Sequence, residues 1–355
     1  MRRITRLLNE IFVEGLSGMA TGLFATLIIG TIIQQAGSLI GGQIGDILFV
    51  IGKIAASVTG VGIGCGVAVR FGTSPLVAMS AATCGMVGAF ASKILAGGVL
   101  VEGNIVYSGP GEPLGAYIAA LAGIYVGRLV SGRTKIDIVI TPLLSILSGS
   151  TVGFVLGPKI SQLMTAIGEV INNATQQQPL IMGVIVSVVM GMALTLPISS
   201  AALGIILNLS GLAAGAATVG CCANMIGFAV ASYRENKING LLAQGLGTSM
   251  LQIGNIVKNP FIWLPAIITS AILGPVSTVV LHMTNNATGS GMGTAGLVGQ
   301  ITTFQTMVAE GAVPEIVLIE IVLLHFVLPA FLSWHISEFM RKLQWIKKGD
   351  MKLHV

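Results

Sequence analysis

A polar, glycine-rich segment, residues 285–300 (NNATGSGMGTAGLVGQ), has the residue types best suited to binding a solute. It lies between two apolar runs, residues 260–281 and 313–334, each long enough to span a bilayer. Irregular backbone between such spans is tolerated only where protein buries it or where it lines a wet cavity. The segment could bind solute oxygens, or it could be a purely structural re-entrant turn. Its candidate solute-binding residues are Asn285, Asn286, Thr288 and Gly291.

The same segment contains a literal G-x-G-x-x-G at residues 291–296. In dinucleotide-binding proteins this motif follows a strand and opens a helix within a βαβ unit. Here it follows an apolar span and a polar loop. The motif therefore does not predict a nucleotide site.

Further polar residues lie inside apolar runs, where hydrocarbon penalises them. Thr195 and Ser199 flank Pro197, and Asn224 lies in a long apolar stretch. These positions are candidates for a solute site. Hydrogen bonding between helices would explain them equally well.

Two ionisable residues, Glu320 and His325, lie within the last apolar run, where a charge costs about 2.5 to 3.5 kcal/mol on insertion scales. They are five residues apart and therefore point to different faces of a helix. We predict a solute-binding or proton role for Glu320. A carboxyl group satisfied by a neighbouring helix is the alternative.

Catalytic motifs of soluble enzymes are missing from the sequence: it has no P-loop, no H-E-x-x-H and no carboxylates at a useful spacing. The four cysteines lie in apolar segments without a C-x-x-C spacing, so neither a disulfide framework nor a zinc site is suggested. We expect no cofactor and no metal.

The composition predicts an all-α, polytopic membrane protein. Hydrophobic residues make up 54% and charged residues 9% of the chain, which has 48 glycines and a mean hydropathy of +0.91. The net charge of +5 is accounted for by basic residues beside the spans, which argues against a nucleic-acid partner. Alternating glycines at 60, 62, 64 and 66 predict close packing of helices.

The order of apolar runs and basic flanks predicts five segments. They are an amphipathic interfacial helix (1–14, with Arg2, Arg3 and Arg6), an amino-terminal membrane half (15–157), an amphipathic linker helix (158–178), a carboxy-terminal half with the solute site (179–338) and a basic cytoplasmic tail (339–355). We expect about 8–10 transmembrane helices with re-entrant hairpins.

The distribution of basic residues predicts the orientation of the chain. Arg133, Arg234 and the tail should be cytoplasmic and Glu102 outside, with both termini inside. Nine unbroken spans fit the sequence, whereas two termini on one side require an even number. We therefore predict a re-entrant element, either near Pro197 or at residues 285–300.

Several motifs of the chain resemble a known family. They are IVITPLL (138–144), GPKI (157–160), GVI (183–185), MGMA (190–193), GLG (245–247), KNP (258–260) and GEPLGA (111–116). In these the chain resembles fructose-type enzyme IIC (EIIC) subunits of the bacterial phosphotransferase system (PTS). It is most similar to a stand-alone subfamily that includes membrane regulators of the perfringolysin-regulator type.

Two departures from the fructose type bear on the solute. Ser249-Met250 stands where that type has Thr-Glu before its Asp-Pro, and Pro197-Ile198-Ser199-Ser200 stands where it has Pro-Val-Asn-Lys. Without these charged groups, the resemblance favours an uncharged, hydroxyl-rich or otherwise undetermined solute. It adds Ser249 to the candidate residues.

The resemblance implies a permease that moves a small polar solute, a sugar or a related compound, by alternating access. It also implies a homodimer in the bacterial plasma membrane. Phosphotransfer would require separate IIA and IIB proteins, because the histidines and apolar cysteines of this sequence do not offer the reactive groups that such steps need. The alternative function is a solute-sensing membrane regulator that acts on a cytoplasmic or transcriptional partner.

The orientation can be tested with single cysteine substitutions and an impermeant thiol reagent added to intact cells. We expect labelling of Glu102→Cys and none of Arg133→Cys, Arg234→Cys or Lys348→Cys, because the positive-inside rule places the last three in the cytoplasm. Labelling of Arg234→Cys from outside would contradict the re-entrant topology.

Overall fold

The computed structural model describes residues 7–353 except 108 and 176. The three amino-terminal arginines and His354 lie outside the described residues. The described chain is almost entirely helical, and its only sheet is the antiparallel pair β1 (Leu100–Val101) and β2 (Asn104–Ile105). The prediction of an all-α protein is confirmed.

Six helices in the described ranges are long and apolar enough to cross a membrane. They are Leu7–Ser38, Pro113–Val130, Asp137–Ile160, Gly211–Ala231, Pro260–Val280 and Pro314–Lys342. A bent pair of helices, Gly42–Ser57 and Thr59–Arg70, gives a seventh if it is counted as one span. This number of spans confirms the polytopic membrane class.

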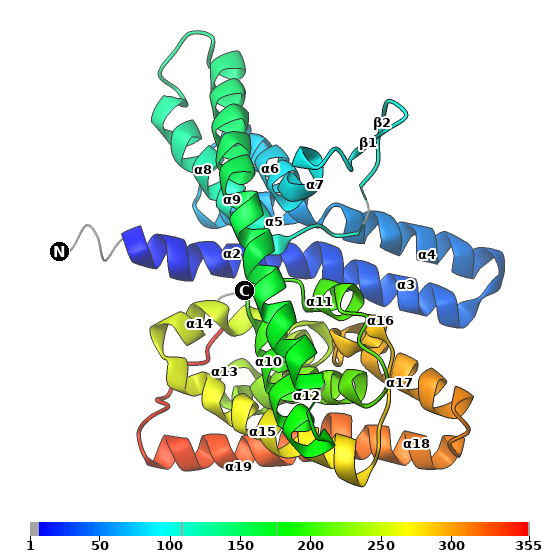
Figure 1. The fold of residues 1–355 in the computed structure, drawn as a ribbon. Helices are drawn as coiled ribbons and strands as arrows, with labels where there is room; N and C mark the ends of the chain where they lie inside the picture. The colour runs from blue at the N-terminus through cyan, green and yellow to red at the C-terminus, as the bar shows by residue number, and fades with distance from the viewer. Residues whose placement is uncertain (1–6, 108, 176, 354–355) are drawn as a thin grey trace. The chain divides into compact units, whose positions relative to one another are not determined.

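The chain forms two compact units, one ending at Met164 and the other covering Thr165–His354 (Figure 1). The first contains η1 (Glu10–Gly15), α2 (Leu16–Leu23), η2 (Phe24–Ile28), α3 (Ile29–Ile40), α4 (Gly42–Ser57), α5 (Thr59–Arg70), α6 (Pro75–Ala89), α7 (Ala91–Leu95), β1, β2, α8 (Pro113–Val130) and most of α9 (Asp137–Thr175). The predicted linker, residues 158–178, falls largely within α9, which is continuous across the unit boundary.

The core of the first unit is built on glycine contacts along two faces of α5. A Cβ atom on Gly22 of α2 would lie 2.0 Å from the carbonyl oxygen of Gly62, and one on Gly64 would lie 2.1 Å from that of Ala81 in α6. A Cβ atom on Gly66 would likewise lie 2.3 Å from the carbonyl oxygen of Gly18 in α2. Because the alternating glycines face α2 and α6 in turn, α5 can approach both helices at backbone distance.

The apolar run at residues 44–69 is bent by 55° rather than straight. At the bend, the hydroxyl of Ser57 donates to the carbonyl of Ile54, and that of Thr59 donates to the carbonyl of Ala56. Such back-bonding competes with the helical hydrogen bonds and bends helices.

Two ion pairs hold the beginning of the first long helix. Glu10 lies 2.5 Å from Arg128 at the end of α8, and Glu14 lies 2.7 Å from Arg70 at the end of α5. The described part of the predicted interfacial helix, residues 7–14, is thus continuous with the first span and paired with its neighbours. Its position at a membrane surface stays a prediction.

The second unit packs around α12 (Gly211–Ala231), which has seventeen buried residues. Its other elements are α10 (Pro179–Thr195), α11 (Ser200–Ile206), α13 (Tyr233–Leu242), η3 (Ala243–Gly247), η4 (Ser249–Gln252), α14 (Ile253–Lys258), η5 (Pro260–Trp263), α15 (Leu264–Pro275), η6 (Val276–Val280), α16 (Ala287–Ser290), η7 (Ala295–Leu297), α17 (Val298–Ala309), α18 (Pro314–Ile321), η8 (Val322–Val327) and α19 (Leu328–Lys342). A Cβ on Gly220 would lie 1.9 Å from the carbonyl oxygen of Ser187, so α12 and α10 are also in backbone contact.

The chain after α19 folds back onto the second unit. Ile346 and Met351 are 2% and 0% exposed. The side-chain amide of Gln252 donates to the carbonyl of Met351, and that of Asn255 donates to the carbonyl of Lys352. The tail is therefore an integral layer beneath η4 and α14.

Replacing Gly22 by alanine tests the glycine contacts. We expect Gly22→Ala to lower the stability by about 1–3 kcal/mol, because its Cβ overlaps the α5 backbone. The measurement is thermal unfolding of the purified protein in detergent. Gly98→Ala is the control, since the nearest atom to that Cβ is 3.6 Å away. Equal melting temperatures for the two variants would contradict the packing argument.

Candidate functional site

The first feature of the site is the break after α10. The helix ends at Thr195, and the next residue, Leu196, is extended with ψ 160°. Pro197 explains this, because a proline disfavours helical geometry in the residue before it. The chain turns within residues 196–199 and begins α11 at Ser200. Broken helices of this kind bind substrates in several transporter folds.

A buried polar network lies directly at this break. Thr195 Oγ1 is 2.7 Å from Ser249 Oγ and 3.2 Å from Asn224 Oδ1. The same Asn224 oxygen accepts a hydrogen bond from the Trp263 indole at 2.9 Å, and the Asn224 amide donates to Ser270 Oγ at 3.2 Å. Two predicted site residues, Thr195 and Ser249, are thus in direct contact, on elements 54 residues apart.

The predicted site loop, residues 285–300, is fastened to α12 by its first asparagine. Asn285 is 1% exposed, and its side-chain amide donates to Thr218 Oγ1 at 2.8 Å and to the carbonyl of Gly299 at 3.2 Å. The Asn286 side chain accepts from the backbone amide of Gly289, as an N-cap of α16. Thr288 is exposed.

The glycines of the loop serve close packing. The carbonyl of Gly291 accepts a hydrogen bond from Ser200 Oγ at 2.7 Å, and a Cβ there would lie 2.2 Å from the carbonyl oxygen of Ser200. Gly293 has φ +52° and would bring a Cβ within 2.8 Å of the Cys221 backbone. Contacts with α11 and α12 thus explain the first two glycines of the G-x-G-x-x-G pattern, and the third, Gly296, has a positive φ of 54°.

The polar groups of α12 connect the loop and the network. Thr218 contacts the loop and Asn224 belongs to the network, six residues further along the helix. At 1.5 Å per residue this separation is about 9 Å. Two cysteines lie between them. Cys221 Sγ donates to the carbonyl of Ser290 in the loop, and Cys222 Sγ accepts from the Gln300 side-chain amide of α17. Six residues correspond to about 600° of rotation, so the two side chains point about 120° apart around the axis. The helix α12 therefore carries polar groups of both regions on different sides of its surface.

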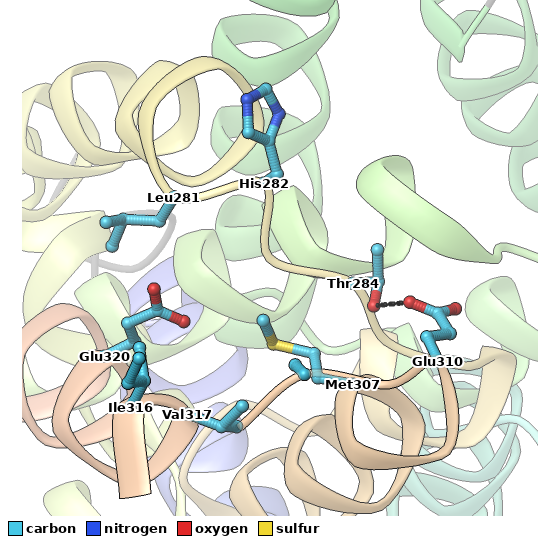
Figure 2. A pocket seen from close by; sticks show the side chains of 9 residues that line it. Leu281, His282, Thr284, Met307, Glu310, Ile316, Val317 and Glu320 are labelled. Carbon is cyan, nitrogen blue, oxygen red and sulfur yellow. Dashed lines mark hydrogen bonds between the residues drawn. The ribbon is translucent and has the colours of Figure 1, made fainter. Parts of the chain in front are cut away.

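An open pocket of about 290 Å³ lies next to the start of the loop. Figure 2 shows the carboxyl groups of Glu310 and Glu320 on either side of Met307, with His282 and Thr284 above. Thr284 Oγ1 donates to Glu310 Oε2 at 2.6 Å. Leu281, Ala312, Ile316 and Val317 complete the lining. This volume lies near the lower end of the range for small-molecule sites.

The eight predicted site residues therefore fall into three places. Thr195 and Ser249 share the network, with buried Ser199 at the same helix break. Asn285, Asn286, Thr288 and Gly291 lie in the loop, and Glu320 lines the pocket. Within the described residues, no hydrogen bond joins Glu320 to the network.

Sequence reasoning missed three contributors. Trp263 and Thr218 show no distinguishing signal, because an indole or a threonine in an apolar span is ordinary. Glu310 could have been found, since it is an acidic residue in the short gap between two apolar runs.

Metal binding has no geometric support in the described ranges, where no three His, Cys, Asp or Glu side chains gather closely enough to hold an ion.

A family model described as "Phosphotransferase system, EIIC" matches residues 13–353. A search of curated proteins finds no match.

Because the Asn285 side chain bonds the loop to α12 and α17, we expect its replacement by alanine to lower the stability of the protein. Asn285→Ala removes two buried hydrogen bonds, to the Gly299 carbonyl and to the Thr218 hydroxyl, which keep Thr302 and Ala214 as their other partners. At about 0.5–1.5 kcal/mol for each bond, the loss should be about 1–3 kcal/mol. The control Thr288→Ala changes an exposed residue of the same loop and should have the melting temperature of the wild type. A melting temperature of Asn285→Ala equal to that of Thr288→Ala would contradict the role.

Proposed function

Because the chain belongs to the EIIC family of the phosphotransferase system, whose model matches nearly its whole length, we propose that it is a permease that moves a small hydroxyl-rich solute by alternating access. The family supports a sugar-type membrane permease, in agreement with the resemblance of its motifs. The family assignment also favours transport over the sensing alternative. The finer proposal concerns the solute and the residues that bind it.

The observation that carries the proposal is that α12 is hydrogen-bonded to both interruptions of the helical pattern in this unit. One is the turn at residues 196–199, reached through Asn224, and the other is the loop that begins at residue 281, reached through Thr218. Non-helical backbone at membrane depth is tolerated where it lines a cavity or is buried in protein. We propose that the solute enters at the pocket and moves along α12 to the network.

At the network, the hydroxyls of Thr195 and Ser249 bond to each other and not to a solute. In the conformation that binds solute, they would exchange this bond for bonds to solute hydroxyls. Such an exchange costs little, because the number of hydrogen bonds is conserved. It would link solute binding to a movement of η4 relative to α10.

The pocket suits a neutral polyhydroxyl compound. Its polar groups are two carboxylates, a threonine hydroxyl and an imidazole, and no Lys or Arg lies among its lining residues. Carboxylates accept strong hydrogen bonds from hydroxyl groups and repel anions. An unphosphorylated sugar or polyol fits this chemistry better than a sugar phosphate.

The family usually works with IIA and IIB proteins, and any phosphotransfer to the solute would use them as separate partners. The basic residues after α18 that could face such partners are Lys342, Lys347, Lys348 and Lys352, whereas Arg341 is 11% exposed and paired with Glu235. We propose that this surface is cytoplasmic. Phosphocarrier docking there would bring the phosphoryl group to the side where the solute leaves.

The solute can be sought by thermal shift with hexoses, pentoses and polyols, since a ligand of the folded state raises the melting temperature. For the solute found, we expect Glu320→Gln to weaken binding about tenfold, because a hydrogen bond to a charged group contributes about 1.5–3 kcal/mol. Glu315→Gln is the control, on the same helix but outside the pocket lining.

Uptake into proteoliposomes distinguishes transport from sensing. We expect uptake of the stabilising solute by wild type and Glu315→Gln, and reduced uptake by Glu320→Gln. Equal binding by all three proteins would remove Glu320 from the site. A solute that binds without crossing the membrane would favour the sensing alternative.

A further inference from the structure

The core of the second unit contains two polar side chains whose hydrogen-bonding capacity is not used. Oε1 of Gln300 and Oγ1 of Thr303 have no partner among the described residues, and the two residues are 7% and 0% exposed. Buried polar groups are nearly always hydrogen-bonded, because an unpaired one has lost the bonds that it makes in water. Two such groups one helical turn apart on α17 therefore need an explanation.

The hydroxyl of Thr303 differs from that of its neighbour. Thr302 Oγ1 donates to the carbonyl of Val298, one turn earlier in α17, at 2.8 Å. Thr26 and Thr31 in the first unit make the same kind of bond within their own helices. Thr303 makes no such bond in the described structure. Its hydroxyl is therefore available to a group outside the helix.

The side chain of Gln300 is held at one end only. Its Nε2 lies 3.1 Å from Nδ1 of His325 and 3.3 Å from Sγ of Cys222, whereas its Oε1 has no partner in the described ranges. If the amide were turned over, its oxygen would pair with these groups and its nitrogen would be unpaired. One end of the amide is thus free in either orientation. A hydroxyl group fits both cases, because it donates and accepts.

The two residues lie on the face of α17 that leads to the open pocket. At 100° per residue, Gln300, Thr303 and Met307 fall within an arc of about 60°. Met307 lines the pocket at the end of this row, about 6 Å along the helix from Thr303 and about 10 Å from Gln300. The unpaired groups therefore lie one and two helical turns behind the Met307 wall of the pocket.

We propose that Gln300 and Thr303 form a solute-binding position behind Met307, taken by two neighbouring hydroxyl groups of a neutral polyhydroxyl solute. One hydroxyl bonds to the free end of the Gln300 amide, and the other bonds to the hydroxyl of Thr303. The position lies on the proposed route, because Gln300 also contacts Cys222 of α12. This inference rests on the proposed permease function.

The side chain of Met307 controls access to this position. Figure 2 shows it between the carboxyl groups of Glu310 and Glu320, and it is 6% exposed. An unbranched thioether side chain has three rotatable bonds and repacks readily. A change of its rotamer would connect the pocket to the unpaired groups of α17 without the movement of a helix.

The surroundings of this position favour a neutral hydroxyl ligand over an ion. The groups bonded to Gln300 are a thiol and an imidazole ring, and Met307 belongs to an apolar cluster with Val219 and Leu324. Among these residues there is no carboxylate, Lys or Arg to pair with a buried charge. An ion would therefore lose its hydration without compensation, whereas a hydroxyl exchanges its bonds to water for bonds to Gln300 and Thr303.

Access behind Met307 can be measured without knowledge of the solute. The full chain with Thr303→Cys, in lipid nanodiscs, is treated with iodoacetamide, a small neutral thiol reagent, and alkylation of each cysteine is followed by mass spectrometry. We expect the new cysteine to react at least tenfold faster than that of Thr269→Cys, a position that is equally buried but has its hydroxyl paired with Ser333. Equally slow alkylation of the two variants would overturn the proposal.

Binding distinguishes a solute position from one that holds only water. Because the Thr303 hydroxyl has no partner to lose, Thr303→Val should keep the melting temperature of the wild type. It should weaken binding of the sugar found in the thermal-shift screen about threefold to tenfold, the effect of one lost hydrogen bond. Thr303→Ser restores the hydroxyl and should recover most of this affinity, and the control Thr302→Val should bind as the wild type does. Unchanged binding by Thr303→Val would overturn the proposal.

Deoxy analogues of that sugar identify the hydroxyl that pairs with Thr303. One analogue should bind the wild type about threefold to tenfold more weakly than the parent sugar, yet bind Thr303→Val as well as the parent does. If every analogue loses the same affinity in both proteins, the effects are additive and the hydroxyls bind elsewhere. A sugar that is transported but insensitive to Thr303→Val refutes this position alone. If the wild type binds and transports no sugar, the permease proposal fails, and this position fails with it.

Discussion

In hydrocarbon, each backbone amide and carbonyl must find a partner inside the protein, and this constraint governs the second unit. Two stretches leave the helical pattern within it, and both are satisfied by the rest of the unit. The break at residues 196–199 is covered by the network of Thr195, Ser249 and Asn224. The loop at 285–300 is held by Asn285 and by its contact with α11. Because each break depends on side chains from distant helices, neither could move without exchanging these bonds, and such an exchange is what a transport cycle requires.

In both units, glycine residues let the helices pack closely. Around α5 and α12, missing Cβ atoms bring carbonyl oxygens to distances that any side chain would block. Close backbone approach increases dispersion contacts where lipid offers no hydrophobic driving force. The abundance of glycine in this chain is therefore a packing device in most positions. In the loop it also permits the positive φ of Gly293 and Gly296, which turn the chain into α17.

Local composition and short motifs were enough to predict the membrane class, the non-helical loop at residues 285–300 and the family. The break at Pro197 could also be predicted, because a proline disfavours helical geometry in the residue before it. Partners distant in sequence could not be predicted. Asn285 bonds to a threonine 67 residues away, and Ser200 bonds to a glycine 91 residues away. No periodicity encodes such pairs. The pocket could not be predicted either, because Glu310 of the α17–α18 connection and Glu320 of α18 line it together with Leu281 and His282, about thirty residues earlier.

The folded-back tail has a consequence for biogenesis. Gln252 and Asn255 receive their main-chain partners from residues synthesised 99 and 97 positions later, at the end of the chain. Each amide also has a partner closer in sequence: Gln252 donates to Gln244 Oε1 at 2.9 Å, and Asn255 donates to Gln252 Oε1 at 2.7 Å. Before residues 351 and 352 are synthesised, both amides therefore keep one partner and lack the other. The element that carries Ser249 can reach its final packing only once these residues have been translated and folded back, so a chain cut short before Met351 would leave part of this polar layer unpaired.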